Sequence, residues 1–173
     1  MTWVGAEVPG ATPFQQLLGL RPELQPLVND YLAAAWAASD PVVLELCRLR
    51  IAALHGDRAQ QRLRHDTAVA AGLTEQQVAA LPRHHDSPLY TDHQRRCIAY
   101  AEQYVLDVHG ITDAQAEAIR AETGDDGFVA FTVALGLFDG LGRMRLALGL
   151  DDDPPDDDTP VLVPTPRADS PAH

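Results

Sequence analysis

The sequence predicts an all-α fold, a single-domain bundle of six or seven helices, and three observations lead to that prediction. Apolar residues recur at spacings of three and four along most of the chain, as they do on one face of a helix. Three segments begin with Thr-x-x-Gln, a capping box whose two side chains bond the free backbone groups of a first helical turn. No segment alternates polar and apolar residues with a period of two, so we predict no strand.

The helical domain is expected over residues 21–150. Residues 1–20 contain three glycines and two prolines, which predict an irregular N-terminal arm. A first helix begins near Pro22, where the apolar stripe comprises Leu24, Leu27, Val28, Tyr31, Leu32 and Ala35. The next helix runs from Pro41 to His55, because Asp40 supplies a capping side chain and proline suits the first helical position. It is apolar nearly all round, so we expect it at the centre of the core.

The remaining helices are bounded by glycines, prolines and capping side chains. Gly56 is predicted to end the central helix and Asp57 to cap a following helix that runs to Gly72. The capping boxes predict helices at about 74–81, 91–108 and 112–121, and a last helix spans about 126–148. Residues 151–173 are rich in Asp and Pro and predict a disordered tail. Within it, the apolar patch 161–163 is either solvated or docked on a neighbouring subunit.

The composition excludes several classes of function. The net charge is -12, half of it beyond residue 150, which argues against nucleic acid and membrane as partners. All 13 cations are Arg, so lysine Schiff-base chemistry is excluded. The N-terminus does not resemble a leader and no run of 18 apolar residues occurs, so we expect a cytoplasmic protein. The two cysteines, Cys47 and Cys97, are expected to be buried thiols, with a redox pair as the alternative.

Six segments carry a resemblance to a known family. They are the helix–Gly–helix unit around Gly56, the stretch Gly-Leu-Thr-Glu-Gln-Gln-Val at 72–78, and residues 44–52, 87–91, 107–112 and 135–143. In this order and spacing they resemble the carboxymuconolactone decarboxylase / alkylhydroperoxidase-D-like family over roughly residues 41–150. The resemblance implies an all-α fold with a helical hairpin around the active site. It also implies a homo-oligomer, either a trimer or a hexamer.

The redox members of that family carry Cys-x-x-Cys at the start of the second helix, a His four residues later and a Glu twelve residues before the first Cys. The corresponding positions here hold Asp57, Gln60, Arg64 and Glu45. A shift of one residue brings His65 to the His position but places Arg58 and Gln61 at the cysteine positions. Both registers exclude Cys-x-x-Cys peroxidase chemistry, and residual hydroperoxide reduction through the two other cysteines is a minor alternative.

Glu45 is the first candidate for acid–base chemistry, because it is a charge on an otherwise apolar helix. Desolvation would raise its pKa toward the range of a general base. The alternative is a structural ion pair with Arg48 or Arg50. Glu45, Arg48 and His55 share a helix and are able to border one cleft.

The other candidates follow Gly56. Asp57 is interpreted either as a helix cap or as a substrate ligand, together with Gln60. Charged residues of the predicted second helix, Arg64 and His65 among them, mark either a solvated face or a cationic pocket with His65 as acid–base group. His84 and His85, with His93, are interpreted as a surface loop, so no metal and no cofactor are expected.

Two functional hypotheses follow. The first is a cofactor-free acid–base enzyme, of decarboxylase, lactone or isomerase type, acting on a small organic metabolite. Glu45 with His55 or His65 is then catalytic, and Arg48 or Arg64, with Asp57 and Gln60, binds the substrate. The second is a non-catalytic ligand-binding or assembly protein on the same scaffold. An enclosed pocket on which Glu45 and at least one His converge favours the first hypothesis. A Glu45 engaged by arginines, in a chain without a cavity, favours the second.

Overall fold

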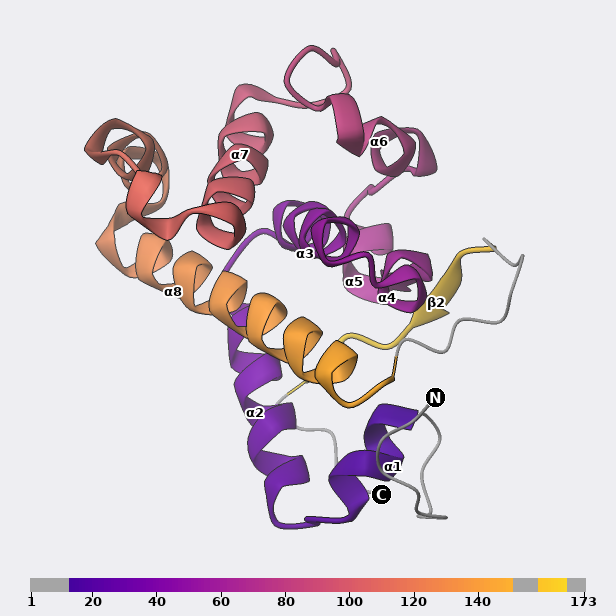
Figure 1. Ribbon diagram of the computed structural model, residues 1–173. Helices are drawn as coiled ribbons and strands as arrows, with labels where there is room; N and C mark the ends of the chain where they lie inside the picture. The colour runs from indigo at the N-terminus through magenta and orange to yellow at the C-terminus, as the bar shows by residue number, and fades with distance from the viewer. Residues whose placement is uncertain (1–12, 151–158, 168–173) are drawn as a thin grey trace.

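The computed structural model describes residues 13–150 and 159–167, and it confirms the all-α fold class (Figure 1). The described residues form eight α-helices, against the six or seven predicted. The α-helices are α1 (Pro13–Gly19), α2 (Leu24–Ala37), α3 (Pro41–His55), α4 (Arg58–Arg62), α5 (Asp66–Ala70), α6 (Glu75–Ala80), α7 (Asp92–Leu106) and α8 (Asp113–Ala147). Two 3₁₀ turns, η1 (Leu81–Arg83) and η2 (Val108–Gly110), and two strands, β1 (Leu63–His65) and β2 (Val161–Val163), complete the elements.

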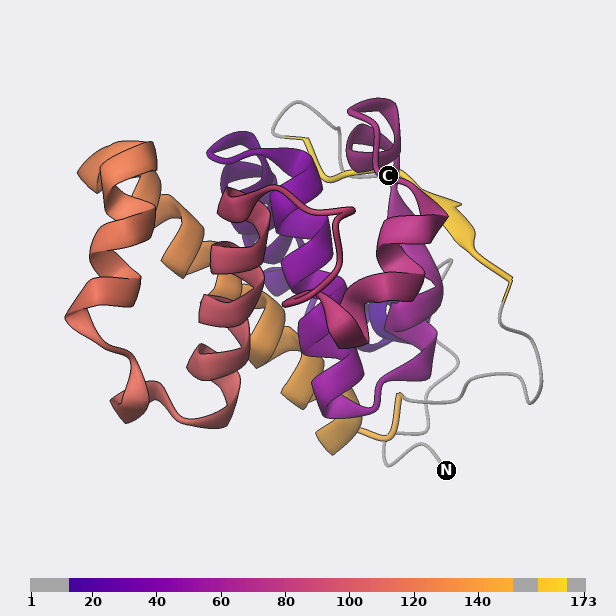
Figure 2. The same cartoon turned by 90° about the horizontal axis from the view of Figure 1, so that it is seen from above.

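Helix α3 lies at the centre of the core, as its apolar sequence predicts. It packs between α7 on one side and α4 and α5 on the other, with α8 crossing it (Figures 1 and 2). Leu44, Leu46 and Cys47 of α3 are fully buried. The helix begins where expected, because Asp40 Oδ1 accepts a hydrogen bond of 2.9 Å from the backbone N–H of Val43. Placing this helix centrally lets its polar side chains reach the neighbouring elements on several sides.

The predicted helix ends are confirmed at most positions. All three Thr-x-x-Gln boxes form, with bonds in both directions between cap and third residue. Gly56 ends α3 with a φ of 72°, and Asp57 caps α4. The two helices predicted at 112–121 and 126–148 are continuous as α8 except at Gly124, whose φ of 77° and ψ of 174° break the helical backbone.

The prediction of one helix from Asp57 to Gly72, and of no strand, is wrong. The segment is divided into α4, β1 and α5, and β1 pairs in parallel with β2 in the register Leu63↔Val161 and His65↔Val163. Three residues are too few to show a period, and the strand exists only because a segment almost a hundred residues later supplies its hydrogen bonds. The expected tail disorder is therefore also wrong for residues 159–167. The patch 161–163 docks on its own chain, an arrangement that neither interpretation of it included.

The N-terminal arm is likewise only partly irregular. Residues 13–19 form α1, whereas residues 1–12 of the predicted arm lie outside the described residues. At the other end of the domain, α8 is long and apolar enough to cross a membrane by length and composition alone, a test that core helices also pass. In this protein α8 packs along α2, α3 and α7 and buries Phe131, Leu135 and Phe138 in the core. The core packing nevertheless buries only 22% of the most apolar stretch of α8.

Candidate functional site

A cavity of about 170 Å³ lies where α1, α2, α3, β1 and α8 meet. Its walls are mainly apolar and aromatic, formed by Phe14, Leu32, Trp36, Leu63, Phe138 and Leu141 among others. Six polar residues border the same space: Arg48, His55, Asp57, Gln60, His65 and Arg145. An apolar pocket with a few convergent polar groups is the usual form of a small-molecule site. Five of the seven residues that the sequence singled out border this pocket, whereas Glu45 and Arg64 do not.

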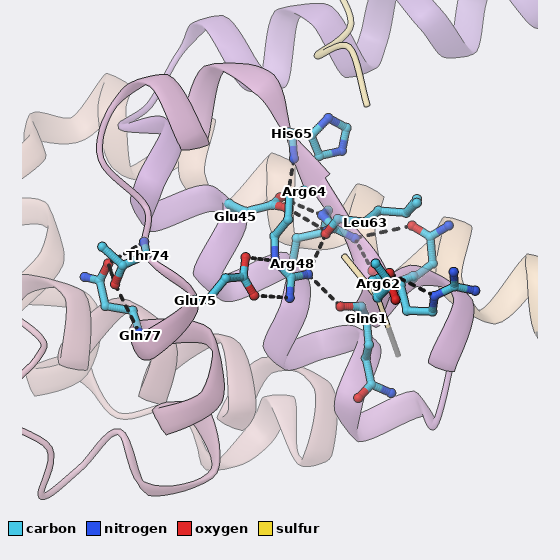
Figure 3. A network of polar contacts seen from close by, with 12 residues as sticks. Glu45, Arg48, Gln61, Arg62, Leu63, Arg64, His65, Thr74, Glu75 and Gln77 are labelled. Atoms are coloured by element: carbon cyan, nitrogen blue, oxygen red, sulfur yellow. Dashed lines mark hydrogen bonds and ion pairs between the residues drawn. The ribbon is translucent and has the colours of Figure 1, made fainter. Parts of the chain in front are cut away.

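Glu45 lies behind the pocket wall in a buried ion pair with Arg48 (Figure 3). Its two carboxylate oxygens accept bonds of 2.7 and 2.8 Å from Nε and Nη2 of Arg48, and Oε1 also accepts the backbone N–H of His65 at 3.1 Å. Burial acts to raise the pKa of Glu45, but the charge and hydrogen bonds of Arg48, together with His65, outweigh it and lower that pKa. An ionised carboxylate with three donors is a poor general base. The contacts therefore favour the ion-pair interpretation of Glu45.

Arg48 has no N–H left for a ligand. Besides the two bonds to Glu45, its Nη1 donates to the carbonyl and side-chain oxygens of Gln60 at 3.1 and 3.3 Å. Its Nη2 also donates to the carbonyl of Leu63 at 2.9 Å. All five donors of the guanidinium are thus used within the chain. Arg48 holds α3 against α4 and β1, and in doing so it shapes one wall of the pocket.

Arg64 points away from the pocket. It forms two bonds with Glu75, at 2.9 and 3.0 Å, and donates to the carbonyls of Gln61 and Leu63 (Figure 3). The reason is the strand, because side chains alternate along β1 and place Leu63 and His65 on one face and Arg64 on the other. The prediction that Arg64 and His65 lie on faces of one helix is therefore wrong.

His55 lies at the C-terminal end of α3 and is held by a residue that the sequence did not single out. Its Nε2 is 2.8 Å from Oδ1 of Asp139 on α8, and Arg143 also donates to that oxygen at 2.8 Å. Its Nδ1 is buried and has no hydrogen-bond partner among the residues that the structure describes. Nδ1 lies close to the α8 backbone at Gly142, since a Cβ there would lie 2.6 Å from it. The contact with Asp139 therefore fixes the ring, and one ring nitrogen stays without a partner in a residue that borders the pocket.

His65 is the second imidazole of the pocket. Its ring packs on Trp36, with 4.5 Å between ring centroids. Burial lowers the pKa of His65 to about 4, assisted by the charge of Arg48 and opposed by Glu45, Asp66 and the Pro164 carbonyl. Its Nδ1 is also buried, and no atom of the described part of the chain forms a hydrogen bond with it. His65 is thus a neutral ring at physiological pH.

Arg145 is a pocket cation to which no sequence pattern was assigned. Its Nε donates to Oδ2 of Asp57 at 3.3 Å, its Nη2 donates to the Leu150 carbonyl at 3.1 Å, and its guanidinium lies over the Phe14 ring. Within the described residues its Nη1 donates no hydrogen bond, and its side chain is 12% exposed. Asp57 has a double role, because its Oδ1 caps α4 by accepting the N–H of Gln60 at 3.0 Å. The interpretation of Asp57 as a helix cap is thus confirmed, and its other carboxylate oxygen pairs with Arg145 beside the pocket.

The two thiols lie away from the pocket, on α3 and α7, and both are buried and free. Burial, with a contribution from Cys97, raises the pKa of Cys47 well above its usual range. Burial also raises the pKa of Cys97 to about 12, and Glu122 adds to the effect. Both thiols are therefore poor nucleophiles at neutral pH, as the buried-thiol interpretation expects.

The histidines after η1 form only part of the surface loop that was predicted, because His85 is exposed and His84 is buried. His84 is 1% exposed and His85 stacks on it, while His93 pairs instead with Glu122 at 2.7 Å. Adjacent histidines in a Pro-bounded segment resemble a solvated loop in sequence. Only the packing of the loop against α7 shows that the first of them points inward.

Fold and pocket together define an all-helical protein with an apolar pocket between its central and C-terminal helices. Residues 22–103 match the model of the Carboxymuconolactone decarboxylase family. The match runs from the start of α2 to near the end of α7, so it begins and ends earlier than the resemblance over residues 41–150. No curated protein matches the chain.

Proposed function

We propose that this protein is a cofactor-free acid–base enzyme. Its substrate is a small organic acid that has a single ring or is about as large as a single-ring compound. In this proposal Arg145 binds the carboxylate of the substrate, and His55, oriented by Asp139, moves a proton. The observation that supports it best is that three residues with an unused polar atom, among the residues that the structure describes, border one apolar pocket. They are His55 and His65, each with a buried Nδ1 that has no hydrogen-bond partner, and Arg145, whose Nη1 donates no hydrogen bond.

Buried polar atoms without a partner are rare in folded proteins, and each one costs free energy. Two such atoms on one small cavity are accounted for if a ligand supplies their partners. A cation beside them adds a preference for a negatively charged group, because guanidinium binds carboxylate with charge-assisted hydrogen bonds. The size of the cavity limits the rest of the ligand, since a cavity of about 150 Å³ accommodates benzene.

His55 has the arrangement of an acid–base group. Because Asp139 accepts from Nε2, the neutral ring carries its hydrogen there and presents the lone pair of Nδ1. Proton removal by Nδ1 forms an imidazolium that Asp139 stabilises, and the same proton is then available to another atom of the substrate. His65, neutral above a pH of about 4, is placed to hydrogen-bond the substrate but not to carry charge. Glu45 takes a positioning role, since it holds the His65 backbone and Arg48.

The family resemblance supports the location of this site. The two positions at which the resemblance places the redox cysteines are Asp57 and Gln60, and both border the pocket. The pocket therefore coincides with the expected active site of the family, with an acid–base set of residues in place of thiols.

The alternative is a non-catalytic protein that binds the same class of ligand. It is favoured by one observation, the complete engagement of Glu45 by Arg48 and His65, which removes the one proton-handling group shared with the redox members. The two proposals agree on Arg145 and differ on whether His55 transfers a proton.

The test has a binding arm and a turnover arm. Binding of single-ring carboxylates, with carboxymuconolactone among them, is followed by the fluorescence of Trp36, which borders the pocket. Turnover of the bound compounds is followed by ultraviolet absorbance. We expect Arg145→Met to weaken binding at least 10-fold, and His55→Asn to bind normally but lose about 100-fold or more in turnover. His109→Asn, at an exposed position on η2, is the matched control.

Binding without turnover in wild type would select the non-catalytic alternative. Unchanged binding in Arg145→Met would reject the assignment of the carboxylate site, and full turnover in His55→Asn would reject the acid–base role.

We further propose that the protein works in the cytoplasm as a trimer or hexamer. Apolar side chains exposed along α2 support self-association, with Leu27 64% and Tyr31 50% exposed in the single chain. Light scattering of the purified protein measures the assembly, and a monodisperse monomer at micromolar concentration would contradict it.

A further inference from the structure

We propose that His84, His85 and Glu102 form a binding site for a divalent transition metal, best suited to Zn²⁺. His84 and His85 follow η1, and Glu102 lies on α7. One ligand atom from each residue lies within 4.8 Å of the other two. None of the three borders the pocket, so the inference is independent of the proposed enzyme function.

The distances within the cluster fit a shared ion and do not fit hydrogen bonds. Oε2 of Glu102 is 3.8 Å from Nε2 of His84 and 3.6 Å from Nε2 of His85. Both separations exceed the length of a hydrogen bond. Two ligands of a tetrahedral Zn²⁺ with bonds near 2.1 Å lie about 3.4 Å apart. The two imidazole–carboxylate separations are within a few tenths of an ångström of that value, and the ligand atoms of the two imidazoles lie within 4.8 Å of each other.

The tautomer of His84 also supports a metal site. Its Nδ1 is 3.1 Å from the carbonyl oxygen of Leu81, and a carbonyl only accepts, so Nδ1 carries the hydrogen. The lone pair of Nε2 then faces the carboxylate of Glu102, and two acceptors oppose each other. Metal-bound histidines are commonly held in this way, with the distal ring nitrogen donating to a backbone carbonyl.

Burial makes this opposition of acceptors costly without an ion. His84 is 1% exposed, and its Nε2 is buried with no hydrogen-bond partner among the residues that the structure describes. An unpartnered imidazole nitrogen beside a carboxylate lacks a cation, and a metal ion supplies one.

The groups around the three residues are compatible with a bound divalent ion. Arg50 donates to Oε1 of Glu102, which orients the carboxylate and leaves Oε2 for the imidazoles. His85 is 63% exposed at its side chain, so water reaches the cluster and supplies the fourth ligand. Two imidazoles and one carboxylate favour Zn²⁺, Co²⁺ or Ni²⁺ over Mg²⁺ and Ca²⁺, which prefer oxygen ligands. The ion would clip the loop after η1 to α7.

Titration of the full-length protein with Zn²⁺, after treatment with a chelator, tests the site by calorimetry. Co²⁺ in place of Zn²⁺ gives visible absorption bands that report a site with nitrogen ligands. We expect one ion per chain, and at least a 10-fold loss of affinity in His85→Ala. His85 is exposed, so this variant removes a ligand without disturbing the core.

Glu102→Gln is the second variant, because it keeps the shape of the side chain and removes its charge. His93→Ala is the matched control, since His93 lies on the same helix as Glu102 and pairs with a different carboxylate. Zn²⁺ affinity that is equal in wild type, His85→Ala and Glu102→Gln would overturn the proposal, as would the absence of Zn²⁺ binding to wild type at micromolar concentrations.

Discussion

Replacing Arg48 by Met should remove a large part of the stability of the fold. Met is close to Arg in length and keeps most of the packing volume, so the change isolates the charge and the hydrogen bonds. Five hydrogen bonds donated by Arg48 disappear, and two of them are bonds that the fully buried carboxylate of Glu45 accepts. Glu45 then keeps only the backbone N–H of His65, and the carbonyls of Gln60 and Leu63 each lose a donor.

The size of the expected destabilisation follows from the burial of the ion pair between Glu45 and Arg48. Removing one partner of a buried ion pair costs about 3–5 kcal/mol, because the other charge stays in the protein interior without compensation. A domain of this size is stable by about 5–15 kcal/mol, so the loss is a substantial fraction of the total. An exposed pair behaves differently and contributes about 0–1 kcal/mol. Arg21→Met is therefore the matched control, since Arg21 pairs with Glu23 at 69% and 55% side-chain exposure.

Urea unfolding measures the difference, with a pH series as a second readout. In wild type the pKa of Glu45 is lowered, so its contribution is present above its ordinary pKa of 4.5 and is lost as the pH falls through the lowered value. In Arg48→Met only burial and one N–H act on the carboxylate, so it takes up a proton more readily. The destabilisation should then shrink as the pH falls.

A double variant, Glu45→Gln with Arg48→Met, removes both charges and should recover part of the loss at neutral pH. An Arg48→Met protein within about 1 kcal/mol of wild type would refute the reasoning. A double variant no more stable than the single one would refute the claim that an uncompensated carboxylate is the cause.

Three other predictions concern the pocket and the strand pair. Gly142→Ala should destabilise the fold by about 1–3 kcal/mol and disturb the ring of His55. Gly140→Ala, where nothing lies within 4 Å of the added Cβ, should instead stabilise the fold by up to about 1 kcal/mol. Equal free energies of unfolding for the two variants would contradict the close approach of Gly142 to His55. Because the pKa of His65 is lowered from 6.5 to about 4, the unfolded chain binds a proton in this range that the folded chain does not, so stability should fall on acidification across it by about 3 kcal/mol in total. Urea unfolding of His65→Asn over the same range should show a shallower pH dependence, and an unchanged slope would argue against a buried neutral ring. Thr165→Val should lower the free energy of unfolding by about 1 kcal/mol, because the Thr165 hydroxyl is hydrogen-bonded to the Thr67 hydroxyl at 2.7 Å. Leu162→Ala, at a 63% exposed position of β2, should have a smaller effect. The reverse order would show that the tail stabilises the fold by apolar contact.

The helices could be predicted from the sequence because their signals are local. A capping box or a Pro41 after Asp40 lies within four residues of the backbone groups that it satisfies. The strand pair could not, since β1 depends on β2, and no residue near Leu63 shows that partner. The same dependence accounts for the error at Arg64, whose direction is set by the strand and not by a helical repeat.

The residues of the pocket also divide into those whose proximity could be predicted from the sequence and those whose proximity could not. Glu45, Arg48 and His55 share α3, and their common neighbourhood follows from helical spacing. Asp139 and Arg145 come from a helix more than eighty residues later. A signal for Arg145 nevertheless exists, because Phe131, Leu135, Phe138, Gly142 and Arg145 are separated by four, three, four and three residues. A charge at the end of an apolar stripe is as unusual as the charge of Glu45 on its apolar helix, and the same criterion therefore marks both residues.

The family match covers only part of the proposed site. The match ends at residue 103, within α7, and includes the ion pair of Glu45 with Arg48 and both imidazoles. Asp139, which fixes His55, and Arg145, a pocket cation whose Nη1 is unused within the described residues, lie on α8 beyond the match. The matched region therefore supplies one wall of the pocket, and α8 supplies the groups that we propose to orient His55 and to bind the carboxylate. Substrate specificity should accordingly respond to substitutions on α8 at Asp139 and Arg145 more than to any change within α4 or α5.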